Sequence, residues 1–131
     1  MWCPGCNEFS IPLFRRWEEI YGGRDDVVVV SMHTVFEGHD VQTPRALRRF
    51  VADHGIEHPV GIDNYRPDDR EVPETMKRFR TGGTPHVVIV DREGKIRFSH
   101  FGVFDAAPVE AFIERLLKEK PGAREALPRR R

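Results

Sequence analysis

Two thiols stand at the start of the chain, in the segment MWCPGCNEF, where Cys3 and Cys6 form a Cys-x-x-Cys pair. Pro4 suits the first position of a helix, which makes Cys3 the expected N-cap and puts its sulfur beside unpaired backbone N–H groups. These donors and the helix dipole favour the thiolate form of Cys3. Cys6 lies one turn later on the same face and can reach Cys3. The spacing therefore predicts thiol–disulfide exchange, with Cys6 placed to resolve a mixed disulfide.

Two other uses of a cysteine pair compete with redox chemistry. Half a zinc site needs two more ligands, and a structural bridge here would close only one short loop. The chain has no second cysteine pair, and its histidines are scattered, at His33, His39, His54, His58, His86 and His100. We therefore predict no metal and no cofactor beyond a redox-active Cys3–Cys6 disulfide.

The composition predicts one ordinary domain. The chain has 131 residues, 39% of them hydrophobic, and its 21 Lys and Arg balance 21 Asp and Glu. That content supports a single core, and the zero net charge gives no global attraction to nucleic acid or membranes. We expect a domain over 1–120 and a basic, disordered tail over 121–131.

No stretch resembles a membrane span or a secretory signal. No apolar run approaches the roughly 18 residues that a span needs, and the N-terminus lacks the basic and apolar regions of a signal peptide. For the sequence as it stands we expect a soluble protein in the cytoplasm.

Four segments have the periodicity or the caps of helices. The first runs from Cys3 to Tyr21, with Pro12 predicting a kink in its interior. The second begins with Thr43 and Pro44 and ends at Gly55. The remaining two are expected at 72–80 and, opened by Pro108, at 108–120.

Four further segments are expected to be strands. The β-branched run Val27 to Met32 has the pattern of a strand buried on both faces, and a short strand follows at 58–63. Residues 86–91 and 95–101, joined by an Asp and Gly turn, predict an antiparallel hairpin. Alternating helices and strands followed by a hairpin predict the α/β class, with a mixed sheet between helices.

Several of these segments together resemble the thioredoxin superfamily, most closely its TlpA-like and AhpC/TSA-type redoxin branch. They are WCPGC at the start of a proline-containing helix, VVVVSM, GIEHPVGID and GGTPHVVIVDREGKIRFSHFG. The resemblance covers roughly residues 2–117 and implies a thioredoxin-like α/β/α sandwich. The helix and strand at 43–62 resemble the insertion that separates TlpA-like proteins from thioredoxin itself.

The resemblance implies roles for particular residues. Cys3 is the attacking cysteine, Cys6 the resolving one, and Pro85 the cis-proline whose loop packs against the dithiol. The backbone of Thr84 offers strand-like hydrogen bonds to a bound polypeptide. Trp2 either contacts substrate as an exposed aromatic or lies half-buried against the core. The implied partners are a protein or small-molecule disulfide and a dithiol that donates or accepts electrons.

The chain departs from the family pattern in its first helix. The helix proline of the family usually comes five residues after the second cysteine, whereas Pro12 comes six after Cys6. We expect a bulge or an altered register in the first turns.

The larger departure concerns the sheet, which is predicted to be N-terminally truncated. In the family, the strand leading into Trp-Cys-x-x-Cys lies between the strands that correspond here to 27–32 and 86–91. Three explanations compete: a misassigned or truncated start, direct pairing of the two flanking strands, or a second copy that fills the gap in a homodimer. An unfilled gap would leave backbone groups unpaired at roughly 1–3 kcal/mol each.

The family strand also carries a buried acid that moves protons for the resolving cysteine. Glu37 and His86 are the candidate substitutes in this chain. TlpA-like relatives often work outside the cytoplasm, and an undetected leader would place this chain there too.

The leading hypothesis is a thiol-disulfide oxidoreductase that reduces or exchanges disulfides through the Cys-Pro-Gly-Cys pair. A peroxiredoxin-like peroxidase is the second hypothesis, although the threonine that this chemistry needs three residues before the attacking cysteine is absent. The third is a non-catalytic thioredoxin-fold module that binds partners through the Thr84–Pro85 edge.

Overall fold

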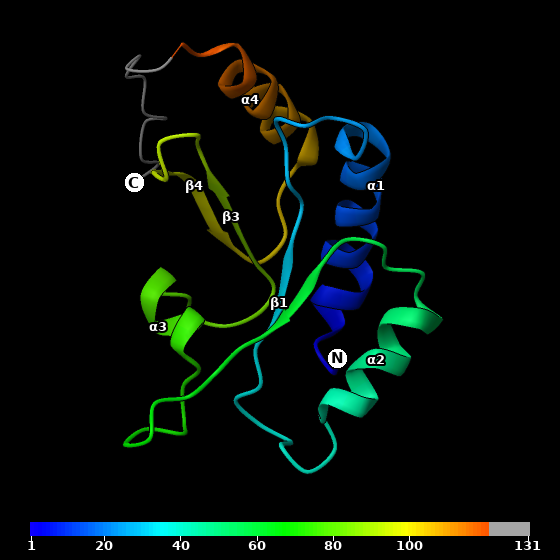
Figure 1. Ribbon diagram of the computed structural model, residues 1–131, viewed down its shortest axis with the longest axis vertical. Coiled ribbons are helices and arrows are strands. Elements are labelled where there is room, and N and C mark those ends of the chain that lie inside the picture. The colour runs from blue at the N-terminus through cyan, green and yellow to red at the C-terminus, as the bar shows by residue number, and fades with distance from the viewer. Residues whose placement is uncertain (121–131) are drawn as a thin grey trace.

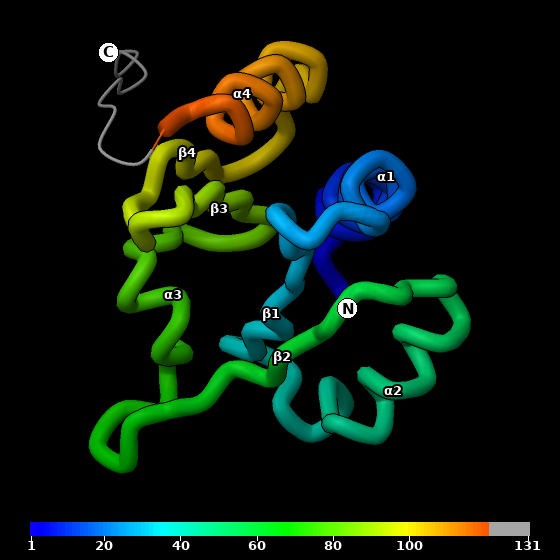
Figure 2. The backbone as a smooth tube through the Cα atoms, turned by 45° about the horizontal axis from the view of Figure 1, so that its top comes forward, coloured from blue at the N-terminus to red at the C-terminus, as the bar shows by residue number. Residues whose placement is uncertain are grey.

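The computed structural model describes residues 1–120, so the tail predicted at 121–131 lies outside the described residues. Figure 1 shows the chain folding as helices around a few short strands. In chain order the elements are η1 (Cys6–Ser10), α1 (Ile11–Tyr21), β1 (Ser31–His33), α2 (Pro44–Asp53), β2 (Val60–Ile62), α3 (Glu74–Phe79), β3 (His86–Val90), β4 (Ile96–Phe101) and α4 (Ala106–Lys118). Helices α1, α2 and α4 lie on one side of the strands and α3 on the other (Figure 2). This is the predicted α/β/α arrangement.

The first helix contains the irregularity that the position of Pro12 predicts. Its turn from Cys6 to Ser10 is a π-helix, closed by the Ile11 N–H donating to the Cys6 carbonyl. A π-turn accommodates one residue more than an α-turn. The extra residue between Cys6 and Pro12 is therefore absorbed before α1 begins, and α1 keeps its register on the core.

The strands form two separate pairs among the described residues. Strand β1 pairs with β2 in parallel, whereas β3 pairs with β4 in an antiparallel hairpin with a register shift between Ile89 and Val90. Both kinds of pairing expected of a mixed sheet are present. The explanation in which 27–32 and 86–91 pair directly is wrong within residues 1–120.

The valine run is where the prediction fails. The paired strand is Ser31–His33, and the run ahead of it belongs to no strand. Val28 and Val30 are 78% and 56% exposed, whereas Val27 and Val29 pack against the core. This alternation is that of a strand with one covered face, because no neighbour covers the other.

The buried core lies where helices α1 and α4 meet strand β3. Leu13, Trp17 and Tyr21 of α1 pack with Val87 of β3 and Val109 of α4. The α1 helix, whose N-terminal extension carries both cysteines, is thereby fixed to the hairpin strand that follows Pro85.

A polar cluster holds α1 against the other strand pair. The buried His58 has its Nε2 2.6 Å from the Ser31 hydroxyl oxygen and its Nδ1 3.0 Å from a Glu18 carboxylate oxygen. The Ser31 hydroxyl thus pairs with Nε2, and the Glu18 carboxylate lies within ion-pair distance of Nδ1. The cluster fixes the position of β1 relative to α1.

Candidate active site

The two cysteines form a disulfide at the N-terminus of the first helix. Cys3 and Cys6 are half-buried, and their Cα atoms are 5.2 Å apart. The Cys6 N–H donates to the Cys3 sulfur at 3.1 Å, and the Asn7 N–H donates to the Cys3 carbonyl at 3.1 Å. Cys3 thus occupies the N-cap position predicted from the sequence, with its sulfur accepting a hydrogen bond from the third helical residue.

The loop before β3 lies directly against the dithiol. The Thr84–Pro85 peptide bond is cis, and the Pro85 ring is buried. A Cβ built on Gly5, between the two cysteines, would lie 3.0 Å from Pro85 Cδ, so any larger residue there would press on the Pro85 ring. The Pro85 carbonyl accepts a hydrogen bond from the Gly102 N–H at 2.8 Å.

Thr84 differs from Pro85 in its backbone hydrogen bonding. Within residues 1–120 neither its N–H nor its carbonyl has a backbone partner. Both groups of this half-buried residue therefore remain available beside the dithiol.

Trp2 directly precedes Cys3, and its ring lies over the loop that follows β1. Its side chain is 54% exposed, and its ring covers Gly38, where a Cβ would overlap it. The ring is therefore exposed rather than half-buried against the core, and its contact with substrate stays a prediction. The ring forms an apolar rim on the loop that follows β1.

Substituting Gly38 tests whether this rim matters. Gly38 has φ +63°, so Gly38→Ala is expected to cost about 1–2 kcal/mol of stability from the left-handed backbone alone, and also to displace the Trp2 ring. Gly55→Ala is the matched control, because Gly55 has φ +58° and no atom within 4 Å of the position that the added methyl group would take. Urea unfolding should give similar losses for both variants. Only Gly38→Ala should alter the tryptophan emission and slow turnover, and equal effects of both variants would contradict a role for the rim.

The two candidate proton carriers are placed differently. Glu37 is exposed, and its side chain makes no hydrogen bond or ion pair within residues 1–120. His86 is half-buried and its Nε2 lies 2.8 Å from the Ser99 hydroxyl oxygen. Burial lowers the pKa of His86, and nearby His100 lowers it further, so the imidazole is neutral at pH 7.

Gln42 is a site residue that the sequence did not reveal. It is 9% exposed, its Oε1 accepts from the Met1 amino group at 3.1 Å, and its Nε2 donates to the Glu37 carbonyl at 2.9 Å. Asn7, next to Cys6, donates to the Met1 carbonyl at 3.0 Å. Gln42 therefore ties the residues that lead into the dithiol to the loop beneath Trp2. No local pattern signals a contact across 41 positions.

His33 lies in the same cluster. Burial lowers the pKa of His33, the positive charge of the N-terminal amino group lowers it further, and the Gln42 side chain opposes the shift. The imidazole beside the N-terminus is therefore held neutral at pH 7.

Metal-binding clusters and membrane-spanning helices are both absent from the part of the chain that the structure describes. No group of three or more histidine, cysteine or acidic side chains gathers within residues 1–120 in a way that could hold a metal ion. Over the same residues no helix is both long and apolar enough to cross a bilayer.

Comparison with known proteins places this site in a family. No family model and no curated protein matches the sequence. Among solved structures, a thiol-disulfide isomerase from Corynebacterium glutamicum is 38% identical with a TM-score of 0.81, over 91% of this chain and 76% of that one. A thioredoxin-like superfamily protein is 36% identical with a TM-score of 0.79, over 91% and 75%. A thioredoxin-like protein in its oxidised form shares the fold at 22% identity and a TM-score of 0.68, over 90% and 72%.

At these identities and coverages the chain belongs to the thioredoxin-like superfamily. With its Cys-x-x-Cys pair at disulfide distance on that fold, it is a thiol-disulfide oxidoreductase.

Proposed function

We propose that Cys3 is the attacking thiolate and Cys6 the resolving thiol, in a cycle that reduces or exchanges disulfides of polypeptides. The Cys3 thiolate attacks one sulfur of a substrate disulfide, forming a mixed disulfide and releasing one substrate thiolate, which takes up a proton. Cys6 loses its proton and attacks the Cys3 sulfur, closing the Cys3–Cys6 disulfide and releasing the second substrate thiolate. An external dithiol then returns both electrons and protons.

The observation that carries the assignment is the hydrogen bond from the Cys6 N–H to the Cys3 sulfur at 3.1 Å. A helix N-terminus stabilises negative charge on the residue that caps it. Cys3 holds that position, whereas Cys6 lies within the first turn and starts the π-helix. A thiolate is therefore better stabilised at Cys3 than at Cys6, both when it attacks a disulfide and when it leaves one.

The substrate surface we propose consists of Trp2, Thr84 and Pro85. Pro85 packs against Gly5, and Thr84 has a backbone N–H and carbonyl without backbone partners within residues 1–120. An extended polypeptide can pair with such groups as an added strand. The exposed ring of Trp2, over Gly38, supplies apolar contact next to Cys3. We therefore propose disulfides of proteins as the substrates. We also propose that the chain belongs to the TlpA-like branch, because it contains the segment with α2 and β2.

For the proton of Cys6 we keep Glu37 and His86 as candidates. Side chains of successive strand residues point to opposite faces, so His86 is directed away from the face on which Pro85 meets Gly5. Glu37 is the better candidate on this ground, because its loop is tied to the dithiol segment through Gln42. Glu37→Gln and His86→Gln should separate the two in a pH profile of turnover, since only the carrier's loss shifts the profile.

The test is turnover of a disulfide-bonded protein with dithiothreitol as the electron source, run beside an assay of peroxide consumption. The chain should accelerate disulfide reduction, and the rate with the Cys3→Ser variant should fall to that of dithiothreitol alone. The unfolding curve of Cys3→Ser should match that of Asp53→Asn, a control substitution at an exposed residue. Peroxide consumption without disulfide turnover would contradict the proposal in favour of a peroxidase. Polypeptide binding without either activity would favour an interaction module.

A further inference from the structure

An open cleft lies between the first helix and the C-terminal end of α2, which are on the same side of the strands (Figure 2). Its volume is about 780 Å³, within the roughly 300–1,000 Å³ that is usual for small-molecule sites. Along the first helix its lining runs from Asn7, which directly follows Cys6, to Glu19, and on the other wall it includes 52–55. The cleft therefore begins beside the segment that contains the dithiol.

Opposite charges line this cleft without pairing with each other. Arg15 of α1 and Asp53 of α2 are both exposed, and within residues 1–120 neither side chain makes a hydrogen bond or an ion pair. Arg16, the other arginine of the lining, is already bound to Glu110. Glu19 adds a second carboxylate, and the C-terminal end of α2 favours positive charge because the helix dipole makes it partly negative. These charges suit a ligand that carries both a carboxylate, for Arg15, and an ammonium group, for Asp53.

The wall between these charges and the dithiol suits the middle of a peptide. Ile11, Pro12 and Ala52 supply apolar surface there. Pro12 has no N–H to donate to the carbonyl one turn before it, so that carbonyl is left to other donors, such as the N–H of a peptide bond.

The length of the cleft indicates the size of its ligand. Asn7 and Arg15 are eight residues apart. This corresponds to roughly 12 Å along a helix that rises about 1.5 Å per residue. An extended tripeptide spans up to roughly 10–11 Å. A ligand of about tripeptide size can therefore contact both Arg15 and the segment beside Cys6.

We propose that this cleft binds a small zwitterionic peptide thiol, which supplies electrons to the Cys3–Cys6 disulfide. The electron transfer rests on the function proposed above, whereas binding in the cleft does not depend on it. Two molecules of the peptide thiol then take the place of one external dithiol.

The reaction balances in two exchange steps. The first peptide thiol loses its proton and attacks one sulfur of the Cys3–Cys6 disulfide, forming a mixed disulfide, and the other cysteine leaves as a thiolate that takes up a proton. A second peptide thiol loses its proton and attacks the sulfur of the first peptide. A peptide disulfide leaves, and the remaining cysteine thiolate is protonated.

Binding is tested with S-methylglutathione, a zwitterionic tripeptide whose sulfur cannot exchange. Amide chemical shifts of the oxidised protein should change at 7–19 and 52–55. Arg15→Gln should weaken binding about fivefold through the loss of one exposed ion pair. Arg48→Gln is the matched control, because Arg48 is also exposed and without an ion pair within residues 1–120 but does not line the cleft, and its affinity should match that of the unsubstituted protein.

Electron transfer is tested with reduced glutathione beside 2-mercaptoethanol, a small thiol without charged ends. Alkylation and intact mass would follow reduction of the Cys3–Cys6 disulfide. The rate should saturate with glutathione and stay proportional to concentration with 2-mercaptoethanol. Arg15→Gln should lower the ratio of the two rates about fivefold at low thiol concentration, whereas Arg48→Gln should keep it.

Two sets of results would overturn the proposal. Unchanged shifts at 7–19 and 52–55 under excess S-methylglutathione, or equal affinities of Arg15→Gln and Arg48→Gln, would show that the cleft is not the binding site. Binding together with a glutathione rate that never saturates would show that the bound peptide is not the electron donor. Failure of the proposed function would appear separately, as a lack of protein disulfide turnover with dithiothreitol.

Discussion

Cys6→Ser protein is expected to hold its substrate as a stable mixed disulfide on Cys3, whereas Cys3→Ser protein should trap none. Cys6 lies within the same helical turn, with its Cα 5.2 Å from that of Cys3. Well-oriented intramolecular reactions reach effective molarities of about 10⁵ M or more, so loss of Cys6 should slow release by at least ~10³-fold at millimolar external thiol. Non-reducing electrophoresis and intact mass would detect the adduct.

The trapping experiment has a built-in symmetry control. Both variants keep one cysteine and both lose the disulfide, so any change in stability from the missing bridge is shared between them. If Cys3→Ser trapped substrate as well as Cys6→Ser does, the hydrogen bond to the Cys3 sulfur would not determine which thiol attacks. The two roles would then be interchangeable.

The cysteine chemistry and most element positions could be predicted because their signals are local. Pro4 after Cys3 predicts the N-cap, and the Cys6 N–H indeed donates to the Cys3 sulfur. Thr43 caps α2 by accepting from the Ala46 N–H, as its position before Pro44 indicates. These interactions span three residues or fewer, so the sequence around each residue contains both partners.

What could not be predicted depends on neighbours distant in the chain. The run Val27 to Val30 has the composition of a strand covered on both faces. Composition shows only that such burial is possible, and no described strand lies beside the run. Gln42 gives no local sign of bonding the Met1 amino group. The irregular first turn could be predicted only by comparing the Cys6-to-Pro12 spacing with a family pattern.

The core contact with the largest expected effect on stability is the indole of Trp17. Its side chain is 4% exposed among Leu13, Tyr21, Val87 and Val109, and its N–H donates to a Glu110 carboxylate oxygen at 3.1 Å. Trp17→Ala should cost about 3–5 kcal/mol, because it removes a buried aromatic and leaves a cavity between α1 and the hairpin. Urea unfolding would measure this loss. It is a large part of the roughly 5–15 kcal/mol that is usual for the free energy of unfolding of a domain.

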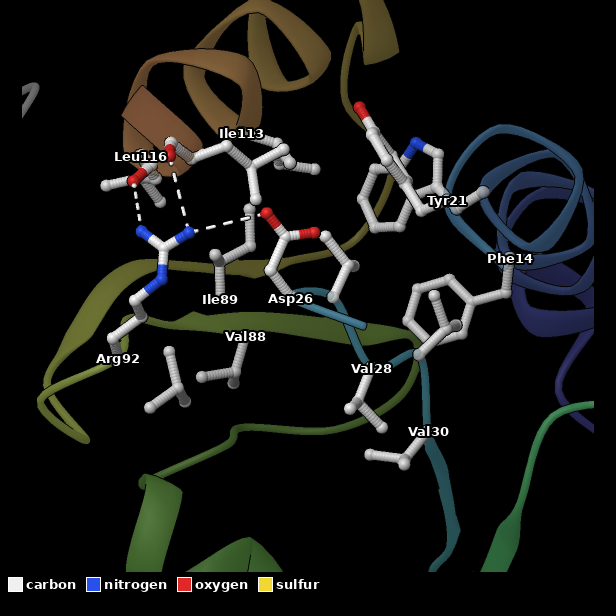
Figure 3. A pocket seen from close by; sticks show the side chains of 15 residues that line it. Phe14, Tyr21, Asp26, Val28, Val30, Val88, Ile89, Arg92, Ile113 and Leu116 are labelled. Carbon is white, nitrogen blue, oxygen red and sulfur yellow. Dashed lines mark hydrogen bonds and ion pairs between the residues drawn. The ribbon is translucent and has the colours of Figure 1, made fainter. Parts of the chain in front are cut away.

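Two comparison variants separate packing from hydrogen bonding at this position. Trp17→Phe keeps most of the ring and leaves Glu110 its bidentate pair with Arg16, so it should cost only about 1–2 kcal/mol. Trp2→Ala, at a half-exposed ring, should change stability by less than ~1 kcal/mol yet impair substrate turnover. Trp17 also lines the hollow between residues 27–30 and β3 (Figure 3). If Trp17→Ala lost no more stability than Trp2→Ala, this side of the core would contribute little to folding. The helix that positions Cys3 and Cys6 would then be held by its contacts with β1 and the Pro85 loop instead.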